Sequence, residues 1–275
     1  MPELAEVETL KRYLERYIKN LVITDYFQYR DNLRYQIAAN MQENMIGAKI
    51  IDVGRRAKFL NIYLDNEYIL TYHLGMSGRL IFETPCYDRK KHDHIIIECG
   101  DSGKLVFNDA RRFGMIYLSK MQEFAEQKFM ENMGPEPLED GFNAEYLFNC
   151  AQGKKVPIKN YIMDNKILVG VGNIYAAESL FHSKIHPKVE AGLLDFQQIS
   201  SLVTAIKEVL KAAIDNGGTT LRDFVSGDNK PGYFQQKLAV YGREGQLCFI
   251  CNHTIEKFRQ AGRSSFFCSK CQKQN

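Results

Sequence analysis

The chain has 275 residues, of which 45% are apolar and 25% are charged. This length and composition exclude a mini-protein and a disordered tail, and they suffice for two domains that each bury a core. Lys and Arg exceed Asp and Glu only by 36 to 33, a balance too small to indicate a partner. The charge is unevenly placed, because residues 230–275 carry eight basic and two acidic side chains, or +6, whereas the remainder carries −3.

No apolar run reaches the roughly 18 residues that a membrane helix needs. The amino terminus, Met1-Pro2-Glu3-Leu4-Ala5-Glu6, is acidic where a secretory signal is basic and then apolar. We therefore expect a cytoplasmic protein with no membrane partner. In a reducing compartment, scattered cysteines such as Cys86, Cys99 and Cys150 are usually buried thiols, and clustered cysteines are usually metal ligands.

Hydrophobic periodicity predicts an amphipathic helix over residues 2–19, with Pro2 in its first turn. From about residue 21 to residue 118 the pattern changes to short β-type runs separated by Gly, Asp and Asn. These runs cover residues 49–53, 59–64, 68–72, 94–98 and 115–118. No long helical pattern alternates with them, so an antiparallel sandwich or barrel is favoured over a parallel sheet.

Residues 133–141 contain two prolines and two glycines among acidic residues, which indicates a domain boundary. Beyond it, helices are predicted over residues 142–150, 157–166, 173–183 and 195–216, and a Gly-rich loop over residues 219–235. The expected segments are residues 1–132, a linker with the first helix over 133–150, residues 151–235 and residues 236–275.

Four cysteines are spaced as in a four-thiolate zinc site, because each pair grips the ion from a tight turn and the residues between the pairs form a hairpin. The pairs are Cys248-x2-Cys251 and, sixteen residues later, Cys268-x2-Cys271. One structural zinc ion is expected. Its role is either only to hold together a segment that would not fold alone, or also to support a hairpin that has a function of its own. With four thiolates the zinc carries −2, so the basic tail keeps about +4, which suits phosphates. Arg259 and Arg263 fall in this hairpin, as solvated charges or as side chains aimed into a groove.

Met1 precedes the small residue Pro2, a context in which Met1 is normally removed to leave a free secondary amine. An α-amino group has a pKa of about 7.7 to 8.0, and the positive end of a helix dipole disfavours further positive charge, so a useful fraction is neutral at pH 7. A neutral amine can attack an aldehyde-like carbon and form an iminium. Glu3 and Glu6 lie close enough in sequence to move protons. The alternative is that Pro2 and Glu3 simply start a helix.

Motifs arranged along almost the whole chain resemble those of one family. They are MPELAEVET at residues 1–9, RRAKFL at 55–60, HLGMSG at 73–78, HDH at 92–94, DARRFG at 109–114, MDNK to VGVGNIYA within 163–176, PGYFQ to VYGR within 231–243, and GRSSFFC at 262–268. In this order they resemble the formamidopyrimidine-DNA glycosylase and endonuclease VIII family of base-excision repair enzymes. The resemblance implies an α+β fold. It makes residues 1–132 a catalytic domain with an N-terminal helix and an antiparallel β-sandwich, residues 151–235 a DNA-binding domain with a helix–two-turns–helix motif and a lesion loop, and residues 236–275 a zinc-finger hairpin.

The resemblance also implies a bifunctional DNA glycosylase and abasic-site lyase that acts on a damaged base swung out of the duplex. By similarity, Pro2 is the nucleophile that attacks the sugar carbon and becomes a Schiff base, and Glu3 is the acid/base group. Lys58 matches the lysine that supports β-elimination and contacts phosphate. Arg263 matches the hairpin arginine that grips the flanking phosphates and assists δ-elimination.

Extruding a nucleotide leaves a gap in the duplex, and Met76, Arg111 and Phe113 match the family residues that fill it. Without the resemblance, Met76 and Phe113 would be interpreted as core residues and Arg111 as a solvated turn residue. The family's contacts to the DNA backbone are matched by His92, Lys154 and Asn173. The expected partner is double-stranded DNA with a damaged base or an abasic site, bound by a monomer.

Ala5 stands where the family usually has a second proline, a departure that concerns reaction rate or lesion range more than reaction type. The segment Tyr233-Phe234-Gln235 and the long loop over residues 219–235 resemble the branch that removes oxidised purines, 8-oxoguanine and formamidopyrimidines. An endonuclease VIII-type glycosylase for oxidised pyrimidines is the alternative within the family. A non-catalytic zinc protein that binds damaged DNA through the basic tail is the alternative from another class.

Overall fold

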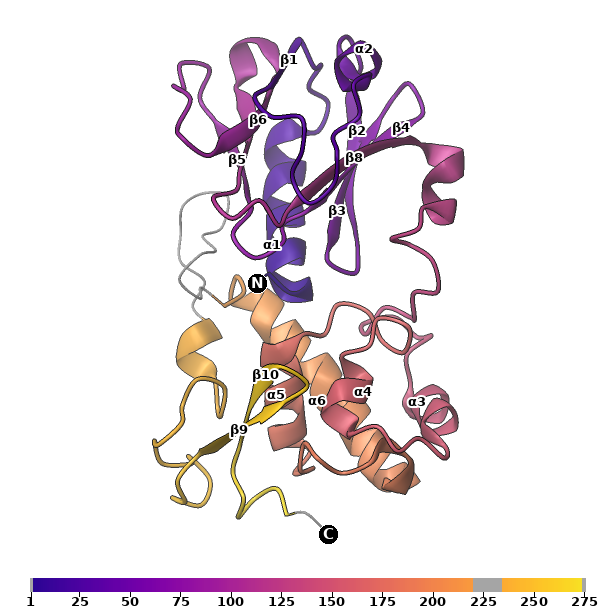
Figure 1. Cartoon of the computed structure of the whole chain (residues 1–275), viewed down its shortest axis with the longest axis vertical. Coiled ribbons are helices and arrows are strands. Elements are labelled where there is room, and N and C mark those ends of the chain that lie inside the picture. The colour runs from indigo at the N-terminus through magenta and orange to yellow at the C-terminus, as the bar shows by residue number, and fades with distance from the viewer. Residues whose placement is uncertain (1, 220–233, 274–275) are drawn as a thin grey trace. The chain divides into compact units, whose positions relative to one another are not determined.

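The computed structural model describes residues 2–219 and 234–273. Within these residues the chain forms two compact units, which are taken separately below (Figure 1). The N-terminal unit contains residues 2–131 and 217–219, and the C-terminal unit contains residues 132–216 and 234–273. The loop predicted over residues 219–235, with Tyr233, lies almost wholly outside the described residues.

The N-terminal unit begins with helix α1, Leu4–Ile18. Its buried face includes Leu10 and Leu14, at the three- and four-residue spacing that predicted the helix. The helix begins later than predicted, because Glu3 is its N-cap and has extended backbone angles, φ −104° and ψ −168°. Pro2 therefore precedes the cap and does not lie in the first turn.

Two four-stranded antiparallel sheets follow, and they confirm the predicted sandwich. In sheet order, the first consists of β1 (Asp25–Gln28), β6 (Asp93–Glu98), β7 (Lys104–Asn108) and β5 (Arg79–Glu83). The second consists of β2 (Ile50–Arg56), β3 (Phe59–Leu64), β4 (Tyr68–His73) and β8 (Met115–Lys120). Short helical segments lie at α2 (Met41–Met45), η1 (Gly100–Ser102) and η2 (Met121–Glu126). Strands β1, β5 and β7 escaped prediction because polar residues stand at their ends and shorten the apolar runs.

The core of this unit lies between the two sheets and under α1. The rings of Tyr72 on β4 and Phe107 on β7 meet there at a centroid distance of 5.4 Å, and both are fully buried. Leu10 and Leu14 of α1 belong to the same apolar cluster. Each such side chain stabilises the fold by about 1.5–3 kcal/mol through removal of apolar surface from water.

The C-terminal unit is built from helices and one hairpin. Its elements are α3 (Ala144–Ala151), α4 (Ile158–Ile162), α5 (Asn173–His182), η3 (Ala191–Leu193), α6 (Phe196–Asp215), η4 (Phe234–Lys237), β9 (Glu256–Gln260) and β10 (Arg263–Phe267). Helix α4 is shorter than predicted because a turn at Asp164 ends it, with Asp164 Oδ1 accepting from the Lys166 amide at 3.0 Å. None of the helices among the described residues has the length and apolarity to cross a membrane.

A buried carboxylate joins the hairpin segment to α5. Glu178 is 1% exposed, and its two oxygens accept from the backbone amides of Ala239, Val240 and Tyr241 at 2.7, 3.0 and 2.8 Å. Such a carboxylate is tolerated in an interior because donors surround it. The chain that enters the cysteine cluster is thereby fixed to the helix beneath it.

Candidate DNA-binding and catalytic site

The start of α1 is held by the carboxylate of Glu6. Its Oε2 accepts from the Glu3 amide at 2.8 Å, and its Oε1 accepts from the amide and the hydroxyl of Thr219, each at 2.8 Å. Gly217 and Gly218 both have positive φ, 74° and 79°, which brings Thr219 onto Glu6. These three donors bind the Glu6 carboxylate, so we assign Glu6 the role of holding this part of the backbone in place. This role replaces the proton transfer that the sequence suggested for Glu6. Both Pro2 and Glu3 are buried.

Lys58 lies in the two-residue turn between β2 and β3. This turn is fixed from within the hairpin, because Arg55 Nη1 donates to the Ala57 carbonyl at 3.0 Å. The same guanidinium pairs with Glu8 of α1 through its Nε at 3.0 Å. Burial raises the pKa of Glu8, but hydrogen bonds to Arg55 and Arg12 outweigh it and lower that pKa overall. The turn that carries Lys58 is therefore tied to the first half of α1.

His73, at the end of β4, places an uncharged imidazole near the cationic side chains of Lys58 and Arg34. Burial, together with the nearby positive charges of Lys58 and Arg34, lowers its pKa from 6.5 to about 4. Its Nδ1 accepts from the Gly75 amide at 3.1 Å. Two cationic side chains around a neutral imidazole form a surrounding that suits a phosphate.

Met76, Arg111 and Phe113 lie at the surface of the N-terminal unit. Met76 is 36% and Phe113 is 47% exposed, so the interpretation of these two as core residues is wrong. The guanidinium carbon of Arg111 lies 5.1 Å from the centre of the Phe113 ring. Met76 is in the loop between β4 and β5, and the other two are in the loop between β7 and β8. Exposed apolar side chains beside an arginine are typical of a binding surface.

The three residues matched to DNA-backbone contacts occupy different elements. His92 is half-buried just before β6, and Lys154 is exposed in the turn after α3. Asn173 is the first residue of α5, and the start of a helix favours an anion. Its side-chain amide donates to the Ser264 carbonyl at 3.0 Å, so it also contacts the hairpin.

Arg263 is exposed at the tip of the β9–β10 hairpin. The turn consists of Ala261 and Gly262, both with positive φ, 45° and 77°, between the paired residues Gln260 and Arg263. Two positive φ values match the right-handed twist of the strands and make a tight, stiff turn.

Lys159 of α4 supports the hairpin from below, and the sequence analysis missed it. It is 3% exposed, and its Nζ donates to the Ser264 carbonyl at 3.0 Å and to Ser265 Oγ at 2.8 Å. A buried ammonium needs such acceptors. The one available signal was a lysine within the mostly apolar segment from Val156 to Ile162, which also contains Asn160.

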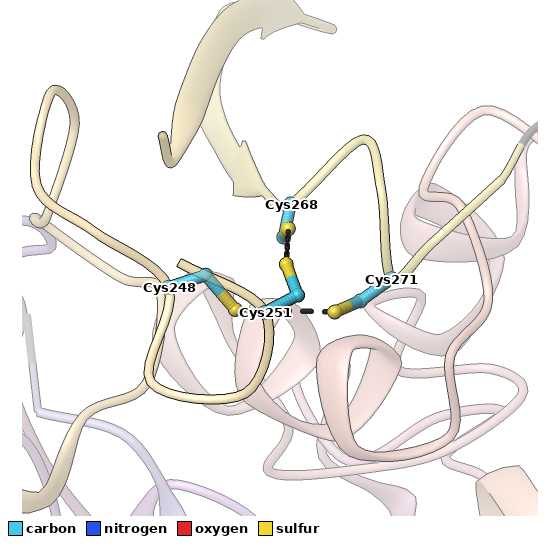
Figure 2. Close-up of side chains that lie close together, drawn as sticks. All are labelled: Cys248, Cys251, Cys268 and Cys271. Atoms are coloured by element: carbon cyan, nitrogen blue, oxygen red, sulfur yellow. Dashed lines mark hydrogen bonds between the residues drawn. The ribbon is translucent and has the colours of Figure 1, made fainter. Parts of the chain in front are cut away.

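The four cysteines converge at the base of this hairpin (Figure 2). Their sulfur atoms all lie within 4.8 Å of one another, with Cys251 to Cys268 at 3.5 Å and Cys248 to Cys271 at 3.9 Å. Four thiolates at about 2.3 Å from a tetrahedral zinc ion lie about 3.8 Å apart, so the donor set and its size fit zinc. This is the single group of potential metal ligands among residues 2–219 and 234–273, and it excludes His92 and His94.

A formamidopyrimidine-DNA glycosylase of Rickettsia bellii (strain OSU 85-389) is 51% identical to this chain over 273 residues, which are 99% of this chain and 100% of the relative. The chain belongs to the formamidopyrimidine-DNA glycosylase family. Family models agree: the N-terminal domain of this glycosylase matches residues 1–116, its H2TH domain residues 133–225, and the zinc finger found in FPG and IleRS residues 245–274.

Solved structures of the family share the fold. A mutant Lactococcus lactis FPG in complex with Fapy-dG DNA and the Lactococcus lactis Fpg in complex with abasic-site DNA are each 31% identical to this chain, with a TM-score of 0.93. Each match covers 99% of this chain and 100% of the other. Membership therefore identifies the chain as a DNA glycosylase with a zinc finger, and confirms the family resemblance, the fold class and the zinc expectation.

We expect Cys268→Ser to release zinc and to weaken DNA binding by at least tenfold (~1.4 kcal/mol) at moderate salt, because the ion organises the hairpin that carries Arg263. Zinc content by atomic absorption and affinity for an abasic-site duplex by fluorescence anisotropy check this. Cys86→Ser is the matched control, since Cys86 is exposed and outside the cluster. Full affinity after loss of zinc would show that the hairpin does not contact DNA.

We also expect the N-terminal unit to lose stability in acid through His73. Its folded-state pKa of about 4 lies below the ordinary 6.5, so the unfolded chain binds more protons as the pH falls from 6.5 toward 4. At pH 5 this amounts to about 2 kcal/mol. His73→Gln should reduce the difference in urea-unfolding free energy between pH 7.5 and pH 5 by about that amount, whereas His182→Gln, at an exposed position, should not. An unchanged pH dependence in His73→Gln would contradict the assignment.

Proposed function

We propose that this chain removes oxidised purines, 8-oxoguanine and formamidopyrimidines, from double-stranded DNA and then cuts the strand at the abasic site. The observation that carries the proposal is the exposure of Met76, Arg111 and Phe113 on one unit that also holds Pro2 and Glu3. A glycosylase must extrude its base to reach the glycosidic carbon, and extrusion requires side chains that can enter the duplex. The proposed site of action is nucleoid DNA in a bacterial cytoplasm, and the proposed active form is a monomer.

In the proposed reaction Pro2, freed by removal of Met1, attacks the anomeric carbon of the extruded nucleotide through its secondary amine. Glu3 protonates the sugar ring oxygen or the leaving base, and the bond to the base breaks as the Schiff base forms. Glu6 supports this chemistry by holding the Glu3 backbone at 2.8 Å. β-Elimination and then δ-elimination break the two bonds between the sugar and its phosphates, and water then hydrolyses the remaining Schiff base to free the amine.

The cationic side chains of the chain are proposed to contact the phosphate backbone of the DNA. Lys58, beside neutral His73, is proposed to contact a phosphate and to support proton transfer in β-elimination. Arg263, on its stiff turn, is proposed to grip the phosphates that flank the extruded nucleotide and to assist δ-elimination. The remaining proposed phosphate contacts are His92, Lys154 and Asn173.

The gap left by extrusion is proposed to be filled from the two exposed loops. Arg111 faces the orphaned partner base through its donors, and Met76 and Phe113 enter as apolar wedges. Unstacking costs on the order of a few kcal/mol per base step, so these contacts offset part of that cost.

Two competing functions are separated by simple assays. An endonuclease VIII-type enzyme excises thymine glycol in preference to 8-oxoguanine opposite cytosine, and the proposal expects the reverse preference. A non-catalytic DNA-binding protein forms no covalent adduct with an abasic duplex under borohydride. Mass mapping of the trapped peptide would locate the nucleophile.

We expect Pro2→Gly to keep DNA binding but to lose most borohydride trapping, at least about tenfold, because the constrained secondary amine is replaced. The trapped fraction on an abasic duplex is the measurement, and anisotropy on the same duplex reports binding. Pro85→Gly, in an exposed loop, is the matched control. Undiminished trapping would place the nucleophile elsewhere in the chain.

For Glu3→Gln we expect excision of 8-oxoguanine to fall by about 100-fold or more while cleavage of a preformed abasic site partly survives, since the acid serves base loss first. The substitution leaves the Glu3 amide on Glu6 intact, because that hydrogen bond comes from the backbone. Single-turnover rates on the two substrates check this, with the exposed Glu43→Gln as control. Equal loss of both activities would contradict the role given to Glu3.

A further inference from the structure

One buried carboxylate joins the two loops that present Met76, Arg111 and Phe113. We define these loops, residues 74–78 and 109–114, as the insertion platform. Asp109 has no exposed surface, and its Oδ1 accepts from Ser77 Oγ at 2.6 Å, across the gap between the loops. The Arg111 amide lies 3.3 Å from the same oxygen and 3.1 Å from Ser77 Oγ. Asp109 thus binds both loops at the bases of the exposed side chains.

The second oxygen of Asp109 closes its own loop, because Oδ2 accepts from the Gly114 amide at 2.7 Å. The Asp109 main chain is itself fixed to the neighbouring segment. Its amide donates to the His92 carbonyl at 3.0 Å, and its carbonyl lies 2.8 Å from Nε2 of the buried His94. The carboxylate therefore acts from a fixed position just after the end of β7.

The two loops also touch backbone to backbone. Gly75 has a φ of 61°, and a Cβ at this position would lie 2.4 Å from the carbonyl of Phe113. A Cβ at Gly114 would lie 2.6 Å from the Phe107 ring and 3.0 Å from Asp109 Oδ2. Both positions require glycine, so the loops meet in one tightly defined arrangement.

We propose that Asp109 is a positioning residue that makes the two loops one preordered wedge, so that Met76, Arg111 and Phe113 enter the duplex together. Ordering the residues of a free loop costs conformational entropy, and exposed side chains gain little packing to offset it. A platform ordered before contact with DNA avoids that cost at the moment of extrusion. This inference rests on the proposed function, since it concerns the residues assigned to fill the gap.

An asparagine of the same shape tests the role. It has one acceptor oxygen in place of two, so Asp109→Asn loses its bond to either the Gly114 amide or the Arg111 amide, and every remaining bond loses the negative charge that strengthens it. Ser77→Ala removes only the link between the loops. The matched control is Asp93→Asn, because Asp93 is equally buried and accepts from Tyr87, Lys90 and Asn108 without a side-chain bond to the platform.

The experiment compares two single-turnover rates for each variant. One substrate is 8-oxoguanine opposite cytosine in an intact duplex, which needs insertion. The other is an abasic site opposite a one-nucleotide gap, which leaves no orphaned base to meet. We expect Asp109→Asn to lower the ratio of the first rate to the second by about 10- to 100-fold. Ser77→Ala should lower it by about three- to tenfold.

A 2-aminopurine placed beside the lesion gives an independent readout, since its fluorescence rises when a wedge unstacks it. We expect the amplitude of this signal to fall in both variants and to persist in Asp93→Asn, together with the wild-type rate ratio. Wild-type ratios and signals in both Asp109→Asn and Ser77→Ala would overturn the inference while leaving the proposed function intact. If Asp109→Asn does not fold, Ser77→Ala decides. A wild-type chain that neither excises 8-oxoguanine nor is trapped by borohydride would overturn the proposed function itself.

Discussion

A charged side chain is stable inside a protein only where hydrogen-bonding groups surround it, and each such group is then held in place in turn. This constraint recurs wherever the chain presents a functional surface. Glu6 holds the start of α1, Asp109 holds the loops of the insertion platform, and Lys159 holds the hairpin. In each case most of the partners are backbone groups or short hydroxyls, so the buried charge fixes the path of the main chain while longer side chains remain free for DNA.

The surfaces fixed in this way differ in the kind of contact they offer. The hairpin and the turn at Lys58 offer cations, whose attraction to phosphate is independent of base sequence and weakens with salt. The platform offers two apolar side chains and one arginine, which suit the interior of a duplex. We thus assign phosphate binding to the hairpin and the turn at Lys58, and base extrusion to the platform. Substitutions in the hairpin or the turn should leave base extrusion largely unaffected, and substitutions in the platform should leave phosphate binding largely unaffected.

Much of this could be predicted from the sequence where a local pattern reports a local structure. Helix α1 follows from apolar spacing, five strands follow from β-branched runs, and the zinc site follows from cysteine spacing. The exposure of Met76 and Phe113 does not follow, because composition alone places such side chains in a core. The roles of Asp109 and Lys159 do not follow either, since their partners lie 32 and 105 residues away along the chain.

The placement of the proposed catalytic and insertion residues in one unit bears on the order of base extrusion and chemistry. Pro2, Glu3 and the insertion platform all belong to the N-terminal unit, so in the proposed reaction the side chains that enter the duplex and the amine that attacks the sugar share one compact unit. In that reaction a correctly seated wedge constrains where the extruded sugar lies relative to the amine, and an undamaged, matched base pair that resists extrusion leaves the amine without its substrate. Selectivity then arises before the chemical step, from the energy needed to open each base pair against a wedge of fixed shape.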